Sequence, residues 1–289
     1  MPERLTIFEV GPRDGLQNEA QPIPTAGKIA LVDALTAAGL REIEVTSFVS
    51  PRWVPQLADA AEVMAGIHRA PAVRYSALTP NMRGFDAARA AGAGMVAVFA
   101  AASESFSQKN INCSIDESFE RFAPILEAAR TEQVPVRGYI SCVTDCPFEG
   151  PVAPAAVASV ARRLRAAGVA QISLGETLGR ARPEAVWGML DAVLEEAPPE
   201  LLAGHFHDTS GGALENVAVA AARGLRVFDS AVGGLGGCPY APGAAGNLAS
   251  ERLLDWARVE GYETGVDPAA LAAAGALAQH LKEGHGDGF

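Results

Sequence analysis

Two histidines separated by one residue are the strongest chemical signal in this sequence. His205 and His207 end a short apolar run, and they are two of only five histidines in the chain. Side chains at positions i and i+2 of a strand point to the same side, so the two imidazoles can share one metal ion. One packed and one solvated histidine is the alternative interpretation. The place of the pair at a strand end favours the metal.

A carboxylate and a cation follow the first apolar run of the chain. Asp14 can supply the anionic oxygen that completes a site of two histidines and one carboxylate. Arg13 beside it would hold a substrate carbonyl or carboxylate. A surface turn is the alternative, because Asp and Gly favour turns. Glu44 lies within another apolar run; a buried carboxylate needs a partner, and we expect that partner to be Arg13.

A glycine-rich loop and a further acid complete the set of candidate groups. Residues 233–246 contain six glycines and precede Asn247. Such backbone freedom suits a lid or a close approach to a ligand, with a flexible connector as the alternative. Cys238 in this loop is a candidate acid–base thiol. We expect Glu176, at the end of another apolar run, to face inward. Together these groups suit carbonyl chemistry through an enolate.

A repeated pattern predicts the elements that must position these residues. Four times an alanine-rich helix end is followed by a glycine and then by a short apolar strand; these glycines are Gly39, Gly92, Gly168 and Gly224. Glycine at this position ends helices. Successive glycines lie 53 to 76 residues apart, about twice the ~30 residues of a strand–helix unit. A second strand is therefore expected between each pair.

Eight strands result, and their number predicts the fold. They are apolar, as a buried parallel sheet requires, and we place them at residues 5–10, 43–45, 73–78, 95–99, 134–141, 172–174, 202–206 and 227–229. Eight strand–helix units in a chain of this length indicate an α/β protein with a (β/α)8 TIM barrel. A doubly wound open sheet is the alternative, but the first turn is not GxGxxG. Catalytic residues of such barrels lie at the carboxyl ends of strands, where the candidates fall.

The composition is that of one acidic globular domain. Of 289 residues, 49% are hydrophobic and 20% are charged, which excludes a disordered chain. We expect the barrel and catalytic loop over residues 1–247, and extra helices with a tail over residues 248–289. A net charge of −11 makes nucleic acid an unfavourable partner. The pattern contains neither a secretory signal nor a membrane span, so we expect a cytoplasmic protein.

Cysteine usage points the same way. Four cysteines are too few for a disulfide scaffold at this length, and Cys142 and Cys146 have no second pair with which to form a zinc site. We therefore expect Cys113, Cys142 and Cys146 to be reduced structural thiols, and only Cys238 to be chemically active.

Longer motifs carry a resemblance to a known family. They are VGPRDGLQNE at residues 10–19, TSFVSPRWVP at 46–55, KNINCS at 109–114, GLGGCPY at 234–240 and GNLA at 246–249. With these motifs the chain resembles, over nearly its whole length, the hydroxymethylglutaryl-CoA lyase family of metal-dependent TIM-barrel lyases. Condensing synthases share the barrel and the paired histidines, but they lack the Gly-Pro of the first motif.

The resemblance implies a reaction, a cofactor and site residues. The family cleaves 3-hydroxy-3-methylglutaryl-CoA to acetyl-CoA and acetoacetate in a retro-Claisen step, using one Mg²⁺ or Mn²⁺. The implied metal ligands are Asp14, His205, His207 and Asn247. In the implied chemistry Arg13 holds the thioester oxygen, Glu44 orients Arg13, Cys238 transfers a proton, and Asp14 or a nearby base removes one. The implied acyl-CoA contacts are Ser47 and Asn110, a homo-oligomer is expected, and the implied pathway is leucine breakdown.

Departures from the family pattern cluster beside the expected metal site. They are Glu176, Phe206, Ser210 and Gly212. We hypothesise that they reshape the acyl pocket, so that the substrate is a related 3-hydroxy-3-alkyl acyl-CoA. Sequence drift without a change of substrate is the alternative.

Three other functions remain as rivals: a Claisen-condensing synthase, a non-catalytic acyl-CoA-binding protein and an iron oxygenase. The first motif argues against the synthase, and the complete set of ligands with Cys238 argues against a binding protein. The barrel and the cysteine loop do not fit the oxygenase.

Overall fold

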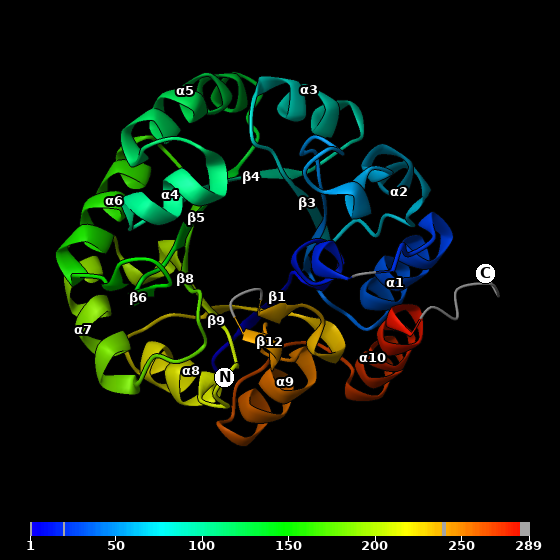
Figure 1. Cartoon of the computed structure of the whole chain (residues 1–289). Coiled ribbons are helices and arrows are strands. Elements are labelled where there is room, and N and C mark those ends of the chain that lie inside the picture. Colours follow the sequence, from blue (N-terminus) through cyan, green and yellow to red (C-terminus); the bar gives the residue numbers. More distant parts are fainter. Residues whose placement is uncertain (1, 20, 239–240, 284–289) are drawn as a thin grey trace.

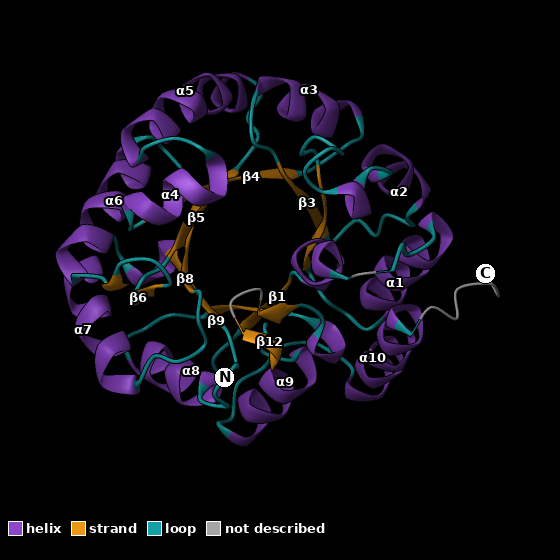
Figure 2. Cartoon of the chain, in the orientation of Figure 1, coloured by secondary structure: helices purple, strands orange, loops and turns teal. Residues whose placement is uncertain are grey.

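The computed structural model describes residues 2–19, 21–238 and 241–283. Within them, parallel strands close into a barrel in the order β1-β10-β9-β8-β5-β4-β3-β2, and helices surround it (Figures 1 and 2). The (β/α)8 barrel predicted from the repeats is confirmed, and each predicted strand overlaps an observed one. The barrel strands are β1 (Thr6–Glu9), β2 (Glu42–Ser47), β3 (Arg74–Leu78), β4 (Met95–Ala101), β5 (Val136–Ser141), β8 (Gln171–Glu176), β9 (Leu202–Phe206) and β10 (Val227–Ser230).

The helices end where the glycines predict. The outer ring contains α1 (Thr25–Ala37), α2 (Ala60–Gly66), α3 (Met82–Ala90), α4 (Glu104–Ile111), α5 (Ile115–Thr131), α6 (Pro154–Ala166), α7 (Pro183–Leu194) and α8 (Ala213–Ala222). Gly39, Gly92, Gly168 and Gly224 lie two residues beyond α1, α3, α6 and α8, with φ between 80° and 95°. That backbone region favours glycine, so these positions stop the helices.

The expected C-terminal helices are present. They are α9 (Ser250–Val259) and α10 (Pro268–Lys282), and α10 lies beside α1 in the outer ring (Figure 1). The tail beyond residue 283 is outside the described residues. No helix in the described part of the chain is both long and apolar enough to cross a membrane.

The outer face of the barrel strands buries apolar side chains, whereas the inner face also buries polar and charged ones. In β8, Ile172 and Leu174 pack outward into the main hydrophobic cluster beneath the helices, while Ser173 between them donates a hydrogen bond to Asp229 inside the barrel. Arg137 of β5 and Asp229 of β10 pair across the interior. This alternation decides which residues of each strand can reach a site at its end.

Short elements shape the carboxyl end of the barrel. The turn after β1, Gly11–Gly15, is a single π-helical turn. After β5, the strands β6 (Asp145–Cys146) and β7 (Gly150–Pro151) form a hairpin. After β10, the strands β11 (Gly237–Cys238) and β12 (Ala241–Ala245) pair as an antiparallel ribbon. The glycine-rich loop predicted as a lid therefore contains regular strand pairing.

Candidate active site

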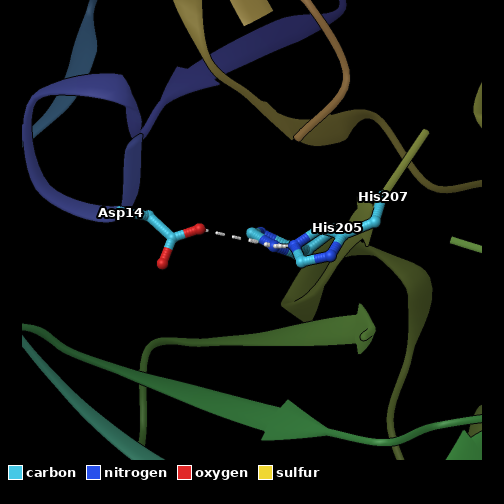
Figure 3. Close-up of side chains that lie close together, drawn as sticks. All are labelled: Asp14, His205 and His207. Carbon is cyan, nitrogen blue, oxygen red and sulfur yellow. Dashed lines mark hydrogen bonds and ion pairs between the residues drawn. The ribbon is translucent and has the colours of Figure 1, made fainter. Parts of the chain in front are cut away.

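Three candidate ligands converge at the carboxyl end of the barrel. His205 and His207 lie at the end of β9, and Asp14 lies in the π-helical turn that follows β1 (Figure 3). One ligand atom from each residue lies within 4.8 Å of those of the other two. Only β10 separates β1 from β9 in the barrel. Residues that are about 190 positions apart in the sequence are therefore neighbours, as the strand order predicted.

Hydrogen bonds orient both imidazoles toward the same point. Nδ1 of His205 lies 3.0 Å from Oδ2 of Asp229, and Nδ1 of His207 lies 2.9 Å from the carbonyl oxygen of Thr177. A carbonyl and a carboxylate can only accept, so both Nδ1 atoms carry the proton. The two Nε2 atoms then present lone pairs 3.2 Å apart. Nitrogen lone pairs that face each other beside a carboxylate fit a divalent cation.

The pKa values of two of these residues also suit metal binding. Burial would raise the pKa of Asp14, but Arg13 and the two histidines overcome that effect and lower it to about 2. Burial, reinforced by His205, lowers the pKa of His207 to about 4. A carboxylate that stays ionised and an imidazole that stays neutral at pH 7 are the forms that bind metals.

Asn247 joins the ligands through a β-bridge with His207. Its Nδ2 donates hydrogen bonds to Oδ2 of Asp14 (3.0 Å) and to the carbonyl oxygen of Leu235 (3.3 Å). With the nitrogen directed to these acceptors, Oδ1 is the atom that can bind a cation. A mixed set of oxygen and imidazole nitrogen ligands fits Mg²⁺ or Mn²⁺, because both ions accept such ligands.

Arg13 bridges two carboxylates. Its Nη1 donates to Oδ1 of Asp14 at 2.6 Å, and its Nε donates to Oε2 of Glu44 at 2.5 Å. The hydroxyl of Tyr139 also donates to Oε2 of Glu44, at 3.1 Å. Burial raises the pKa of Glu44, opposed by the charge of Arg13. The ion pair predicted between Arg13 and Glu44 is therefore present, and it holds a guanidinium beside the candidate ligands.

A cavity of about 900 Å³ opens over these groups. Its polar wall includes Arg13, Asp14, His205, His207 and Asn247. Asn110 of α4 also lines the cavity, as do Lys109 and Arg121. The remaining wall is largely apolar and includes Val49, Leu78, Phe99, Ile111 and Phe122. The cavity can therefore hold a ligand that carries both an anionic or carbonyl group and an apolar group.

Two predicted substrate contacts are corrected by the structure. Gly175 and Thr177 line the cavity, so Glu176 between them points to the outer face of the strand, and its carboxylate accepts from the backbone N–H of Arg180. The prediction of an inward acid is wrong. Ser47 is buried, and its hydroxyl accepts from the N–H of Val49; it is not among the residues that line the cavity.

The other departures from the family pattern are also away from the cavity. Phe206 packs in the main hydrophobic cluster outside the barrel. Ser210 is exposed, and its N–H donates to the carbonyl of Gly179. Gly212 caps the start of α8. None of these three residues, nor Glu176, lines the cavity. The hypothesis that they reshape the acyl pocket by direct contact is therefore wrong.

Cysteine placement separates two classes of thiol. Cys113, Cys142 and Cys146 are buried and free, as predicted. The backbone of Cys238 lies in β11, but its side chain is outside the described residues. Its assignment as the acid–base thiol rests on the sequence.

Sequence reasoning missed Asp229, Tyr139 and the carbonyl of Thr177. Asp229 had a usable signal, because it is a carboxylate within an apolar strand, as Glu44 is. Tyr139 and Thr177 had no such signal, since neither an aromatic residue in a strand nor a backbone carbonyl oxygen marks a site in the sequence.

The chain is similar to known proteins over nearly its full length. A family model described as HMGL-like matches residues 4–277. A Pseudomonas aeruginosa protein named 3-hydroxy-3-isohexenylglutaryl-CoA/hydroxymethylglutaryl-CoA lyase is 58% identical, over 95% of this chain and 92% of its own length. The structure of an HMG-CoA lyase from Brucella melitensis superposes with a TM-score of 0.96 at 54% identity, covering 97% of this chain and 99% of that one. An HMG-CoA lyase from Acinetobacter baumannii, in complex with coenzyme A and 3-methylmalate, has a TM-score of 0.91 at 37% identity, covering 97% of this chain and 92% of that one.

Proposed function

Because the chain belongs to the HMGL-like family, we propose that it is a carbon–carbon lyase that cleaves 3-hydroxy-3-methylglutaryl-CoA to acetyl-CoA and acetoacetate. The relatives that support this reaction match it over more than nine tenths of its length. The observation that carries the proposal is the convergence of Asp14, His205 and His207 on one point beside Arg13. A divalent cation held by these residues and Asn247 would supply Lewis acidity for a hydroxyl and a carbonyl oxygen.

The residues of the chain divide the reaction between them. Cleavage between C2 and C3 leaves the electron pair on the acetyl-CoA carbon, as a thioester enolate. The guanidinium of Arg13, fixed by Glu44, stabilises the oxygen of that enolate. Cys238 gives a proton to the carbon, which completes acetyl-CoA. As the bond between C2 and C3 breaks, the hydroxyl on C3 gives its proton to Asp14 or a nearby base, and C3 becomes the carbonyl carbon of acetoacetate.

The test measures acetyl-CoA released from hydroxymethylglutaryl-CoA by mass spectrometry. We expect release with Mg²⁺ or Mn²⁺ and its loss in EDTA, and we expect Cys238→Ala to lower kcat by about 10²–10⁴-fold, as for loss of a general acid. Cys146→Ala is the matched control, because this thiol is buried away from the cavity. Folded, metal-loaded protein that releases no acetyl-CoA would reject the function.

A second candidate is cleavage of a 3-hydroxyglutaryl-CoA with a longer alkyl group at C3. A relative's name includes the isohexenyl compound, and the cavity has an apolar wall that includes Leu78 and Phe99. The kcat/KM values for the methyl and isohexenyl thioesters decide between the two. A ratio near one supports a dual-specificity lyase, and a ratio of about 100 or more in favour of the methyl compound rejects it.

We infer that the reaction belongs to leucine breakdown, as the resemblance to the family implies. A cytoplasmic location and a homo-oligomeric state remain expectations from the sequence.

A further inference from the structure

The interior of the barrel contains a buried ion pair behind one metal-ligand candidate. Nη2 of Arg137 donates to Oδ1 of Asp229 at 2.5 Å, and neither side chain is exposed to solvent. The guanidinium also lies over the ring of Phe8, 3.7 Å from its centroid. The other carboxylate oxygen of Asp229 accepts from Ser173 at 2.8 Å and lies 3.0 Å from Nδ1 of His205. A chain of contacts thus runs from the barrel core to the metal site.

The two oxygens of Asp229 have separate tasks. Oδ1 faces a guanidinium, which can only donate, and Oδ2 faces His205. As long as the side chain of Asp229 is a carboxylate, both of its oxygens accept hydrogen bonds, and the proton of His205 stays on Nδ1. His207 is held differently, by the backbone carbonyl of Thr177, which no substitution of a side chain removes. The two histidines therefore depend on different parts of the fold for their orientation.

We propose that Asp229 is a positioning residue that fixes the tautomer of His205, and that Arg137 dictates which atom Asp229 can present to it. The inference rests on the metal site of the proposed function. The contacts that carry it lie outside the cavity wall, and neither Arg137 nor Asp229 lines the cavity. Neither residue is therefore placed to touch a substrate. Asp229 reaches the site through His205, and Arg137 also lies 3.4 Å from the hydroxyl of Tyr139.

An amide in place of the carboxylate gives a directional prediction. In Asp229→Asn, Arg137 requires the amide oxygen, so the amide NH₂ must face Nδ1 of His205. Nδ1 then accepts, the proton moves to Nε2, and the lone pair needed for metal binding is lost. In the double variant Asp229→Asn/Arg137→Gln, the glutamine oxygen can accept from the amide NH₂. The amide oxygen is then free to face His205 and restore the original tautomer. The double variant also contains no unpaired buried charge.

The experiment combines a tautomer measurement with a metal titration. ¹⁵N NMR of protein with labelled histidine reports the His205 tautomer in the metal-free wild type and in the variants, and Mn²⁺ affinity is measured by electron paramagnetic resonance. We expect Nδ1–H in the wild type and Nε2–H in Asp229→Asn. We expect Mn²⁺ binding to be about 10–100-fold weaker in the single variant, as for loss of an outer-shell partner, and at least tenfold stronger again in the double variant. Ser173→Ala, which keeps the carboxylate and Arg137, is expected to retain Nδ1–H.

Several results would overturn the proposal. A wild-type His205 that carries its proton on Nε2 would overturn it before any variant is made. Unchanged Mn²⁺ binding in Asp229→Asn would also overturn it. Equal loss in the single and double variants would show a merely structural role. Because the tautomer is measured without metal or substrate, absence of lyase activity would reject the proposed function and leave this result intact.

Discussion

At the scale of the residue, the site depends on buried charged side chains that each have a partner of opposite charge. Arg13 satisfies Asp14 and Glu44 at once, because its planar fork carries donors in two directions. Without it, Glu44 would be a fully buried carboxylate whose pKa is already raised by burial. The same cation that organises the resting site is the one assigned to the enolate oxygen.

Arg13→Lys tests this double use. A lysine ammonium is a single point charge and cannot bridge both carboxylates, so we expect kcat to fall by about 10²–10³-fold, as for loss of an oxyanion donor, with folding retained by circular dichroism. Arg182→Lys is the control, since its side chain is 85% exposed. Steady-state kinetics that leave Arg13→Lys within about threefold of the wild type would contradict the role.

At the scale of the element, glycines at helix ends are not equivalent. Gly39 and Gly168 end corresponding helices with φ of 94° and 85°. A Cβ at Gly39 would lie 2.6 Å from the backbone oxygen of Gly265, whereas a Cβ at Gly168 would meet nothing within 4 Å. Gly39 is therefore required both by the positive φ of the turn and by the close contact with the segment that precedes α10. Gly168 is required by the positive φ alone.

Alanine at the two positions separates these contributions. We expect Gly168→Ala to lower the free energy of unfolding by about 1 kcal/mol, the cost of a side chain at positive φ. Gly39→Ala should cost about 1–3 kcal/mol more, because the backbone at Gly265 must shift. Urea denaturation of both variants gives the comparison. Equal losses would show that the close approach relaxes without cost.

At the scale of the whole molecule, a buried carboxylate joins the first strand to the C-terminal elements. Oε1 of Glu9 accepts from the N–H groups of Gly11 and Val232, at 2.8 and 2.9 Å, and Oε2 accepts from the hydroxyl of Ser250 in α9 at 2.5 Å. Burial raises the pKa of Glu9 to about 7, and these hydrogen bonds oppose the shift. One titratable carboxyl group therefore links β1 both to the segment after β10, where the barrel closes, and to α9.

The raised pKa of Glu9 predicts a pH-dependent stability. The folded state binds the proton more tightly than the unfolded state, whose carboxyl has a pKa near 4.5. The contribution is fully present below pH 4.5 and is lost as the pH rises toward 7, by about 3 kcal/mol at 1.4 kcal/mol per unit. Glu9→Gln keeps the acceptor oxygen and donates to Ser250, so it should lack this dependence.

Urea denaturation of both proteins between pH 4.5 and 8 isolates the effect as a difference, because the other titrating groups are shared. The wild type should lose stability relative to Glu9→Gln up to pH 7 and then remain level. A difference that is constant with pH would contradict the assignment.

Local sequence patterns are sufficient to predict the barrel and most of the residues that form the site. Helix ends, apolar strands and the glycines between them are local patterns, and local patterns are readable because backbone conformation depends on neighbouring residues. The paired histidines, Asp14, and the pairing of Arg13 with Glu44 followed from strand order, since parallel strands bring their carboxyl ends together.

The face that each side chain occupies, and the residues that contact the ligands from behind, become clear only in the folded barrel. Glu176 faces outward because it alternates with Gly175 and Thr177 on the cavity wall, and Ser47 is buried without lining the cavity. Asp229 reaches Arg137 across the barrel interior and His205 on the neighbouring strand β9. Strand register and contacts across the interior depend on closing the whole sheet, which no short stretch of sequence specifies.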